Sequence, residues 1–398
     1  MHPGAFEIPR TLLVKSRTDT SSTPAAAGLA SEARPPTLSS RIPSLDGLRA
    51  IAVLLVFVGH GSTPKGLWPG HLGVTIFFFL SGYLITTLLR REYEASSKIA
   101  LGRFYLRRAF RILPAAYFTI LLALTLAATG VLPSALDGWG VAAQFLNVTN
   151  YYIVQSGDGG LPPETSQLWT LAVEEQYYLV VPLVLLLAYR AGAGRVMIGR
   201  VFVAVALLVP VWRVILGLNG ADFDRLYTST DTRIDAILWG AALALLLNPA
   251  MGDRVRRPGR AGRWAAIHLP LVASVAAVVV ATSATVPSLA FELSIADTIQ
   301  CISLIPIFWF VITRPTSFVG RVLNSRIAVR IGVLSFSIYL LHKIVIALVA
   351  PTMDAPLLTD ALSLALSVVL AQLVFWCVER PFTILRSGIE ARLDRRPA

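Results

Sequence analysis

The chain has 398 residues, of which 55% are hydrophobic and only 15% are charged. Soluble domains average about a quarter charged residues, so this composition excludes an ordinary soluble enzyme and favours a polytopic membrane protein with one integral domain. The net charge of +12 could indicate nucleic-acid binding in a soluble protein, but here its distribution follows membrane topology. Cys301 and Cys377 both lie in apolar runs, so neither a disulfide framework nor a cysteine-based metal site is expected.

The first forty residues are polar and lack the apolar core of a signal peptide, so we expect residues 1–40 to form a disordered cytoplasmic tail. Ten apolar stretches that approach membrane-spanning length follow this tail. They cover residues 48–63, 71–90, 112–131, 168–189, 197–217, 233–248, 264–284, 291–313, 330–350 and 358–379. The sequence therefore predicts an all-α membrane bundle of about ten helices over residues 41–382, with a basic cytoplasmic tail at 383–398.

The charges of the connecting loops support this topology. Arginine and lysine concentrate in the N-terminal tail and in every second segment thereafter: 90–111, 190–200, 249–263, 314–330 and 380–396. The intervening loops are acidic or neutral, with Lys65 and Arg225 as the main exceptions. Basic loops stay on the cytoplasmic side of a membrane, so we expect both termini in the cytoplasm and a location in a bacterial inner or plasma membrane.

The longest connection on the other side of the membrane runs from residue 132 to 167. Its stretch WGVAAQFLNVTNYYIV is apolar and aromatic but contains Asn147 and Asn150, so we interpret residues 139–153 as a re-entrant or interfacial segment. The sequence shows no internal repeat, which disfavours an inverted-repeat transporter. It also contains no phosphate-binding P-loop and no dinucleotide glycine fingerprint, which disfavours an ATPase or a Rossmann enzyme.

Several ionisable residues fall inside the predicted spans, in one band of membrane depth. At about 1.5 Å per residue, His60 lies roughly 16 Å along the first span from Arg49, and Glu174 and Glu175 lie roughly 10 Å below the outer surface. The other members of this band are Asp235 and His342, and Arg233 lies beside Asp235 in the first turn of its span. Such groups are costly in lipid unless they are partnered, so we expect them to line a common polar cavity.

Each of these residues also has a structural interpretation, which the sequence leaves open. His60 could be a satisfied histidine at a helix end, and His342 could simply face the lumen. Glu174 and Arg233 could form an ion pair that holds the fourth and sixth spans together. Asp235 could belong to an intrahelical charge cluster with Arg233.

The segment FYLRRAFRILP and the residue before it carry arginines that would lie near one another on a short helix. These are Arg103, Arg107 and Arg108, and Arg111 continues the stripe. Guanidinium groups bind phosphate oxygens through two parallel hydrogen bonds, so the cluster could hold a phosphate. Positive-inside topology and lipid head-group contact are the alternative explanation.

Six segments, taken together and in order, resemble the acyltransferase-3 family of integral membrane O-acyltransferases, which would make residues 41–382 an acyltransferase-3 membrane domain. They are SLDGLRAIAVLLVFVGH (44–60), GVTIFFFLSGYLI (73–85), FYLRRAFRILPAAY (104–117), LWTLAVEEQYYLVVP (168–182), TRIDAILWGAALA (232–244) and SFSIYLLHKIV (335–345). The resemblance implies transfer of an acyl group, commonly acetyl, from cytoplasmic acyl-CoA to a hydroxyl of an acceptor at or beyond the membrane. Some family members carry a C-terminal SGNH-type domain, which we do not expect here, so a second transfer step would need a separate extracytoplasmic protein.

The resemblance also implies roles for the donor-binding residues. In the family, an arginine followed by ten residues and a histidine is functional, and Arg49 and His60 match this pattern. The polyanionic end of acyl-CoA should stay at the cytoplasmic face, where Arg49 could contact a phosphate or fix the entrance. The arginines expected to hold the nucleotide are Arg103, Arg107, Arg108 and Arg111. No permanently bound cofactor and no metal is expected, because the thioester is already activated.

We expect His60 to act as the general base that takes the proton of the attacking hydroxyl, a task suited to a neutral imidazole. Glu174 would orient that histidine or bind the acceptor. The other candidate substrate-binding residues are Glu175, Arg233, Asp235 and His342. Direct transfer and an acyl-histidine intermediate both remain open.

The acceptor is not encoded in any motif. We expect a hydroxyl on a cell-surface glycan, with a macrolide or another secreted natural product as the alternative acceptor for the same chemistry, and no nucleic acid as a partner. Buried glutamate, histidine and arginine also form proton relays, so a proton-coupled or lipid transporter is the alternative class. A non-catalytic partner in envelope assembly is the third.

Overall fold

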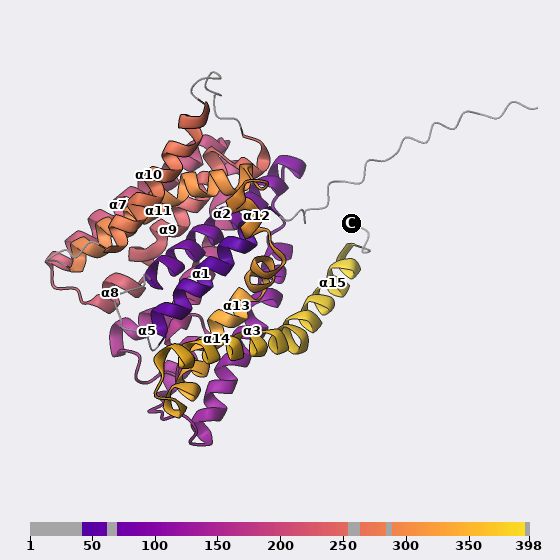
Figure 1. The fold of residues 1–398 in the computed structure, drawn as a ribbon. Helices are drawn as coiled ribbons and strands as arrows, with labels where there is room; N and C mark the ends of the chain where they lie inside the picture. The colour runs from indigo at the N-terminus through magenta and orange to yellow at the C-terminus, as the bar shows by residue number, and fades with distance from the viewer. Residues whose placement is uncertain (1–41, 62–69, 254–262, 284–288, 395–398) are drawn as a thin grey trace, which may run out of the picture. The chain divides into compact units, whose positions relative to one another are not determined.

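The computed structural model describes residues 42–61, 70–253, 263–283 and 289–394 (Figure 1). The tail expected at residues 1–40 lies outside these ranges. Every regular element within them is a helix, which confirms the all-α prediction. Each of the ten predicted spans overlaps a long helix. These are α1 (Leu45–His60), α2 (Gly70–Ser96), α3 (Leu101–Ala128), α6 (Trp169–Arg190), α7 (Arg195–Leu218), α9 (Thr230–Leu246), α10 (Arg263–Ser283), α11 (Leu289–Thr313), α13 (Arg326–Val349) and α14 (Pro356–Val374).

The lengths and surfaces of these helices suit a membrane. Eight helical segments of the described chain are long and apolar enough to cross a bilayer, whereas α1 has 16 residues and the apolar part of α10, Leu269–Val280, is shorter than a span. Large apolar side chains on α7, including Met197, Leu208 and Leu218, are more than half exposed. Such a face would be costly in water and is solvated by lipid. The protein is therefore a multi-pass membrane protein.

The segment around residues 139–153 forms two short helices, as its non-spanning interpretation requires. They are α4 (Gly138–Phe145) and α5 (Thr149–Ser156), of eight residues each. At about 1.5 Å per residue each is roughly 12 Å long, less than half a bilayer core. Asn147, between them, has a positive φ of 55°, and its carbonyl accepts a hydrogen bond of 3.1 Å from Gln176 on α6.

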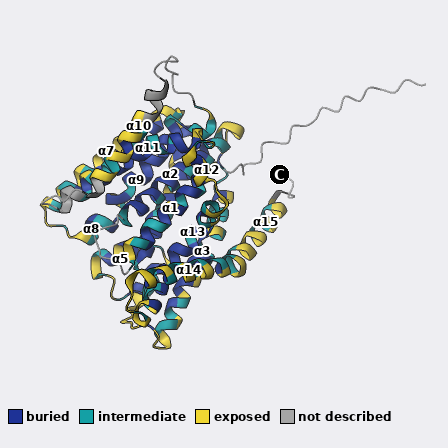
Figure 2. Cartoon of the chain, viewed as in Figure 1, coloured by how far each residue is buried: buried dark blue, intermediate teal, exposed yellow. Residues whose placement is uncertain are grey.

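Helices α2 and α9 pack closely at the centre of the core. A Cβ at Gly82 would collide with the carbonyl of Ile237, and one at Gly240 would collide with that of Phe79. Small residues let membrane helices approach in this way, so that packing replaces the hydrophobic effect that lipid cannot supply. Figure 2 shows buried residues concentrated along α1, α2 and α9, while α15 (Arg380–Asp394) is largely exposed.

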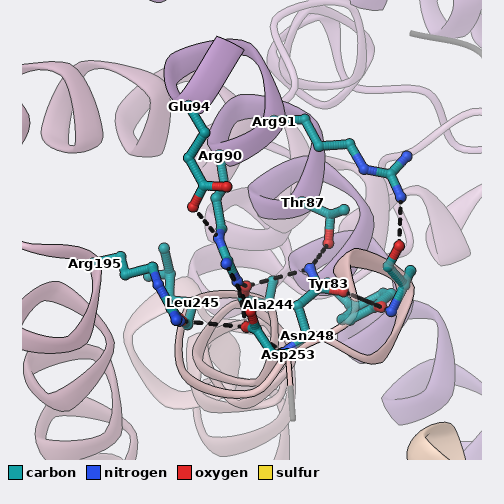
Figure 3. A network of polar contacts seen from close by, with 11 residues as sticks. Tyr83, Thr87, Arg90, Arg91, Glu94, Arg195, Ala244, Leu245, Asn248 and Asp253 are labelled. Atoms are coloured by element: carbon teal, nitrogen blue, oxygen red, sulfur yellow. Dashed lines mark hydrogen bonds and ion pairs between the residues drawn. The ribbon is translucent and has the colours of Figure 1, made fainter. Parts of the chain in front are cut away.

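A network of hydrogen bonds and ion pairs connects α2 with the C-terminal end of α9 (Figure 3). The buried guanidinium of Arg90 donates to both carboxylate oxygens of Asp253, at 2.7 and 3.0 Å, and to the Ala244 carbonyl at 2.8 Å. Arg195 donates to Asp253 at 3.3 Å and to the Leu245 carbonyl at 2.6 Å. The last carbonyls of a helix have no partner within it, so these two arginines satisfy the end of α9 and tie α2 and α7 to it.

Four charged residues form a second buried network between α7, α9 and α11. Arg213 donates to Asp235 and, at 3.1 Å, to Asp297, and Asp297 also accepts from Arg233. Their side chains are at most 3% exposed. The two positive and two negative charges balance, which is how buried charges are tolerated. The ion pair between Glu174 and Arg233 that the sequence left open does not form, because Arg233 is bound to Asp297.

The remaining elements connect or end the bundle. They are α8 (Phe223–Thr228), α12 (Phe318–Leu323), the 3-10 turns Ser166–Leu168, Pro249–Met251 and Ala350–Thr352, and a π-helical turn at Phe375–Glu379. That turn leads directly into α15, so the segment expected as a basic tail at 383–398 is helical as far as Asp394. Glu390 on α15 accepts a hydrogen bond of 2.5 Å from Arg107, which fixes α15 to α3.

Candidate active site

A cavity of about 120 Å³, hereafter the arginine cavity, lies between α1, α2, α3, α6 and α13. Its polar lining residues are Arg49, Ser81, Arg108, Arg111, Thr170, Glu174, Tyr178, Ser335, Tyr339 and Glu379. Pockets for whole drug-sized ligands hold about 300–1,000 Å³, so this space fits a slender chain better than a nucleotide. Three arginines outnumber the two carboxylates of this lining, Glu174 and Glu379, which indicates an anionic ligand.

Helix α1 carries Arg49 at the cavity and His60 at its other end. The start of α1 is fixed by Ser44, whose hydroxyl donates to the Val311 carbonyl at 2.9 Å and accepts from Asn324 at 2.9 Å. Arg49 and His60 are eleven positions apart in the helix, which separates them by roughly 16 Å. The two residues therefore mark two ends of the bundle, here called the Arg49 end and the His60 end.

The four arginines predicted on the basic loop separate into two sets. Arg108 and Arg111, three residues apart on α3, line the cavity, and the Arg108 guanidinium lies 5.0 Å from the centre of the Tyr178 ring. Arg107 points elsewhere and pairs with Glu390, and Arg103 is exposed outside the cavity lining. Residues three apart share a helix face while adjacent ones do not, so the phase of α3 decides which arginines reach the cavity.

The two adjacent glutamates are separated in the same way. Glu174 lines the cavity, where its carboxylate accepts hydrogen bonds from Ser81 at 2.8 Å and from Tyr178 at 3.1 Å. Glu175 is not part of the lining, and its buried Oε1 has no hydrogen-bond partner. Tyr178 follows Glu174 by one helical turn, which brings both onto the cavity face.

His60 and His342 form a pair at the His60 end. Their ring centres lie 5.0 Å apart, and Nε2 of His342 is 3.4 Å from Nδ1 of His60. The same His60 Nδ1 lies 2.9 Å from the Val56 carbonyl. A carbonyl only accepts, so Nδ1 carries the proton and, in a neutral ring, Nε2 of His60 is the basic nitrogen.

Tyr339 connects the histidine pair with the cavity. Its carbonyl accepts from Nδ1 of His342 at 2.7 Å, which leaves Nε2 of His342 as an acceptor that faces His60. The Tyr339 hydroxyl lies 2.7 Å from that of Thr170 and donates to the Gln167 carbonyl at 3.0 Å. Tyr339 and Thr170 line the cavity, while neither histidine does. The basic pair thus stands directly behind one wall of the arginine cavity.

Arg233 and Asp235 lie outside this constellation, in the buried network with Arg213 and Asp297. No group of three or more histidine, cysteine, aspartate or glutamate side chains within the described ranges is arranged to hold a metal ion. Of the predicted site residues, the structure therefore brings together Arg49, Arg108, Arg111 and Glu174 in the cavity, and His60 with His342 behind it.

Comparison with known proteins identifies the family. Residues 42–378 match the acyltransferase domain family. The chain belongs to this family. The resemblance found in the six sequence segments is confirmed, and the match covers every long helix that contributes to the arginine cavity.

The curated relatives of this acyltransferase-family chain are longer proteins. The peptidoglycan O-acetyltransferase OatA of Listeria monocytogenes is 30% identical over 365 residues, which cover 85% of this chain and 55% of the relative. The O-acetyltransferase OatA of Staphylococcus aureus is 30% identical over 366 residues, which cover 88% of this chain and 58% of the relative. The chain spans little more than half of each relative's length. No solved structure matches it.

Sequence reasoning missed several cavity residues of this family member. Tyr178 and Tyr339 could have been found by helical spacing, because they lie four residues after Glu174 and three before His342. In the sequence, Glu379 followed by Arg380 and Pro381 predicts the end of a helix. In the structure Glu379 lines the cavity and accepts a hydrogen bond from Ser337. It ends the π-helical turn Phe375–Glu379, an irregularity that is frequent at functional sites.

Proposed function

We propose that this protein is an acyl-CoA-dependent membrane O-acyltransferase that moves an acyl group, first of all acetyl, to a hydroxyl of a cell-surface glycan. The observation that carries the proposal is the position of the His60–His342 pair directly behind Tyr339, at the wall of a cavity lined by three arginines. Family membership and the relatives' names support acyl transfer in general. The donor, the base and the acceptor are our assignments.

The orientation follows from charge. Basic loops remain in the cytoplasm, so the Arg49 end and both termini would face the cytoplasm of a bacterial cell, with the bundle in its cell membrane. Acyl-CoA is a polyanion and would approach from that side. Arg111 is exposed and Arg49 and Arg108 are half-buried, which suits phosphates held at the mouth of the cavity by guanidinium groups.

The narrow cavity would then receive the pantetheine arm. Its volume suits a slender chain, and its apolar lining residues, such as Phe77 and Leu171, suit the arm's methylene groups. Tyr339 lines the cavity and His60 does not, so the proposal requires the thioester carbon to pass the edge of the Tyr339 ring to reach His60. Direct transfer of the acyl group from the thioester to the acceptor, without an acyl-histidine intermediate, is the simplest sequence of steps.

In that sequence His60 acts as the general base. Its Nε2 takes the hydroxyl proton while the acceptor oxygen attacks the thioester carbonyl, the C–S bond breaks, and the CoA thiolate takes the proton back from the imidazolium. The lone pair on Nε2 of His342, 3.4 Å from Nδ1 of His60, would stabilise that imidazolium. Glu174 lies in the cavity among the arginines and would position the donor's polar groups.

The acceptor comes from the relatives alone. A relative named as a peptidoglycan O-acetyltransferase supports a glycan hydroxyl for this chain ahead of a macrolide. A transporter is less favoured, because the match over residues 42–378 is to an acyltransferase domain.

The experiment uses the full chain in detergent with radiolabelled acetyl-CoA and chitotetraose, a soluble oligomer of N-acetylglucosamine. The wild type should acetylate the sugar, and His60→Ala should reduce transfer by at least about 100-fold, the usual contribution of a general base. His71→Gln is the matched control, since His71 lies outside the cavity lining and the histidine pair, with its Nε2 3.0 Å from Gln300. Full transfer by correctly folded His60→Ala would refute the proposal. Label released to water but never to sugar would assign the glycan step to a separate extracytoplasmic transferase.

A further inference from the structure

A second concave region lies at the His60 end of the bundle. This hollow of about 450 Å³, hereafter the Lys343 hollow, is lined by residues 133–135, by the loop 158–166 and by Lys343 on α13. Its place follows from the course of α13: Gly332 packs against the backbone of Asp46 at the Arg49 end, and Lys343 lies eleven residues further along. Helix α13 lines the arginine cavity from Gly332 to Tyr339, and the hollow lies about one helical turn beyond it.

The walls of the hollow offer both hydrogen-bond donors and acceptors. The Lys343 ammonium donates to the Ser166 hydroxyl at 2.8 Å and lies 3.5 Å from the Glu164 carboxylate. Asp158 and Ser134 complete the polar lining, and prolines 133, 162 and 163 with Leu161 supply apolar surface. The side chains of Lys343 and Glu164 are 20% and 37% exposed, so both are accessible to a ligand.

Glu164 has an unusual backbone conformation. Its φ is +56°, in the left-handed region that side chains other than those of glycine, asparagine and aspartate rarely adopt. Strained residues of this kind cluster at ligand sites, where the surrounding structure holds them. The next residue, Thr165, fixes this part of the loop. Its hydroxyl donates to the Pro162 carbonyl at 2.5 Å and accepts from Gln144 at 2.6 Å.

Hydrogen bonds connect the loop of the hollow with the turn of α13 that carries His342. Gln167, directly after the loop, donates to the Leu340 carbonyl at 3.0 Å, and its own carbonyl accepts from the Tyr339 hydroxyl. One turn of α13 therefore serves three places: Tyr339 lines the arginine cavity, His342 contacts His60, and Lys343 lines the hollow. The hollow and the cavity are therefore both next to His342, through neighbouring residues of one helix.

We infer that the Lys343 hollow binds the acceptor, a sugar whose hydroxyl and amide groups hydrogen-bond to Lys343, Glu164 and Asp158. Sugars present donors, acceptors and apolar ring faces together, as these walls do. One ammonium beside two carboxylates disfavours a polyphosphate and suits a neutral sugar. The inference rests on the proposed function, because it assigns the acceptor site of the same reaction.

The first test measures binding without chemistry. Chitotetraose is titrated calorimetrically into the full chain in detergent, with no acyl-CoA present. We expect Lys343→Met and Glu164→Gln each to weaken binding by about 10-fold, the loss expected for one hydrogen bond to a charged group. Lys98→Met is the matched control, because Lys98 is exposed on the loop at the Arg49 end, and it should bind like the wild type. Binding that is equal in all four proteins would overturn the inference.

The second test separates acceptor binding from a structural role. In turnover assays Lys343→Met should raise KM for chitotetraose about 10-fold, with KM for acetyl-CoA unchanged. Glu164→Gly removes the left-handed strain together with the carboxylate, so its thermal midpoint should be equal to or above that of the wild type while its acceptor KM rises. Parallel changes in donor and acceptor KM would refute the inference. A failure of the proposed function itself would give a different result, namely full activity of the His60→Ala variant.

Discussion

Nε2 of His342 faces Nδ1 of His60 across 3.4 Å, although the two residues lie 282 positions apart in the chain. The Tyr339 carbonyl fixes the tautomer of His342, so its lone pair is directed at the ring that we assign as the base. Removing this acceptor in His342→Phe should lower kcat by about 10- to 100-fold, a share of the usual general-base contribution. Steady-state kinetics with acetyl-CoA and chitotetraose measure the change.

The control for this first prediction is a side chain that keeps an acceptor. The amide oxygen of His342→Gln can still accept from His60 Nδ1–H, so it should recover part of the lost kcat, while KM for acetyl-CoA stays near the wild-type value in both variants. If Phe and Gln behave alike, or if only KM changes, His342 does not act through His60.

The division of the arginines on α3 gives a second prediction. Arg108 lines the arginine cavity and Arg107 pairs with Glu390. Arg108→Gln should therefore raise KM for acetyl-CoA by about 10- to 100-fold, the cost of one charge-assisted hydrogen bond to phosphate. Arg107→Gln, which removes the same charge one position away, should leave KM nearly unchanged.

Acetyl-CoA analogues lacking the 3′-phosphate sharpen this test. If Arg108 binds that phosphate, its variant should discriminate the analogue from acetyl-CoA less than the wild type does. Equal effects of the two substitutions on KM would mean that the arginines act through the general field of the basic loop and not through the cavity.

The sequence predicted the long helices of this protein and part of its site, namely Arg49, Arg108, Arg111 and Glu174. Apolar run length and alternating loop charge are local properties, so they located the ten long helices, although only eight helical segments of the described chain are long and apolar enough to cross a bilayer. Which of Arg107 and Arg108, and which of Glu174 and Glu175, faces the cavity depends on the rotation of each helix about its axis in the packed bundle, because adjacent residues differ by about 100° around that axis. Composition does not carry that information.

The sequence did not predict which distant residues form ion pairs with one another. Arg213 and Asp297 lie 84 positions apart and belong to none of the predicted site residues, yet they hold Asp235 and Arg233 in a buried network. That network explains why two residues expected near the substrate are absent from the cavity. Buried charges are costly alone and stable together, and only the packing of α7, α9 and α11 reveals which charges meet.

The close packing of α2 and α9 gives a third prediction. A Cβ at Gly82 would overlap the Ile237 carbonyl, so Gly82→Ala must push the two backbones apart. Overpacking costs about 1–3 kcal/mol, and more here because backbone atoms cannot rotate away. The thermal midpoint in detergent should fall clearly.

Gly102→Ala is the matched control for this glycine substitution. Gly102 also lies in a helix, α3, but a Cβ there meets nothing within 4 Å. Alanine is favoured over glycine in a helix by about 1 kcal/mol, so this variant should be as stable as the wild type or more so. A Gly82 variant no less stable than the Gly102 variant would contradict the packing described for α2 and α9.

The Arg90–Asp253 pair gives a prediction about pH. Hydrogen bonds from Arg90 lower the pKa of the Asp253 carboxyl below its usual value. A carboxyl whose pKa is lower in the folded state stabilises the fold fully above its unfolded pKa of about 3.9, and this contribution is lost as the pH falls through the folded pKa. Asp253→Asn should therefore be less stable than the wild type by about 2 kcal/mol at pH 7.

The diagnostic quantity is the difference in thermal midpoint between wild type and Asp253→Asn, followed from pH 7 to the lowest pH at which the protein stays monodisperse. Other carboxyl groups titrate in both proteins and cancel, so the difference should be constant near neutrality and shrink below about pH 4. Asp354→Asn, at an exposed site, should show a difference near zero throughout. A gap between wild type and Asp253→Asn that widens on acidification would have the wrong sign for a carboxylate held ionised by Arg90.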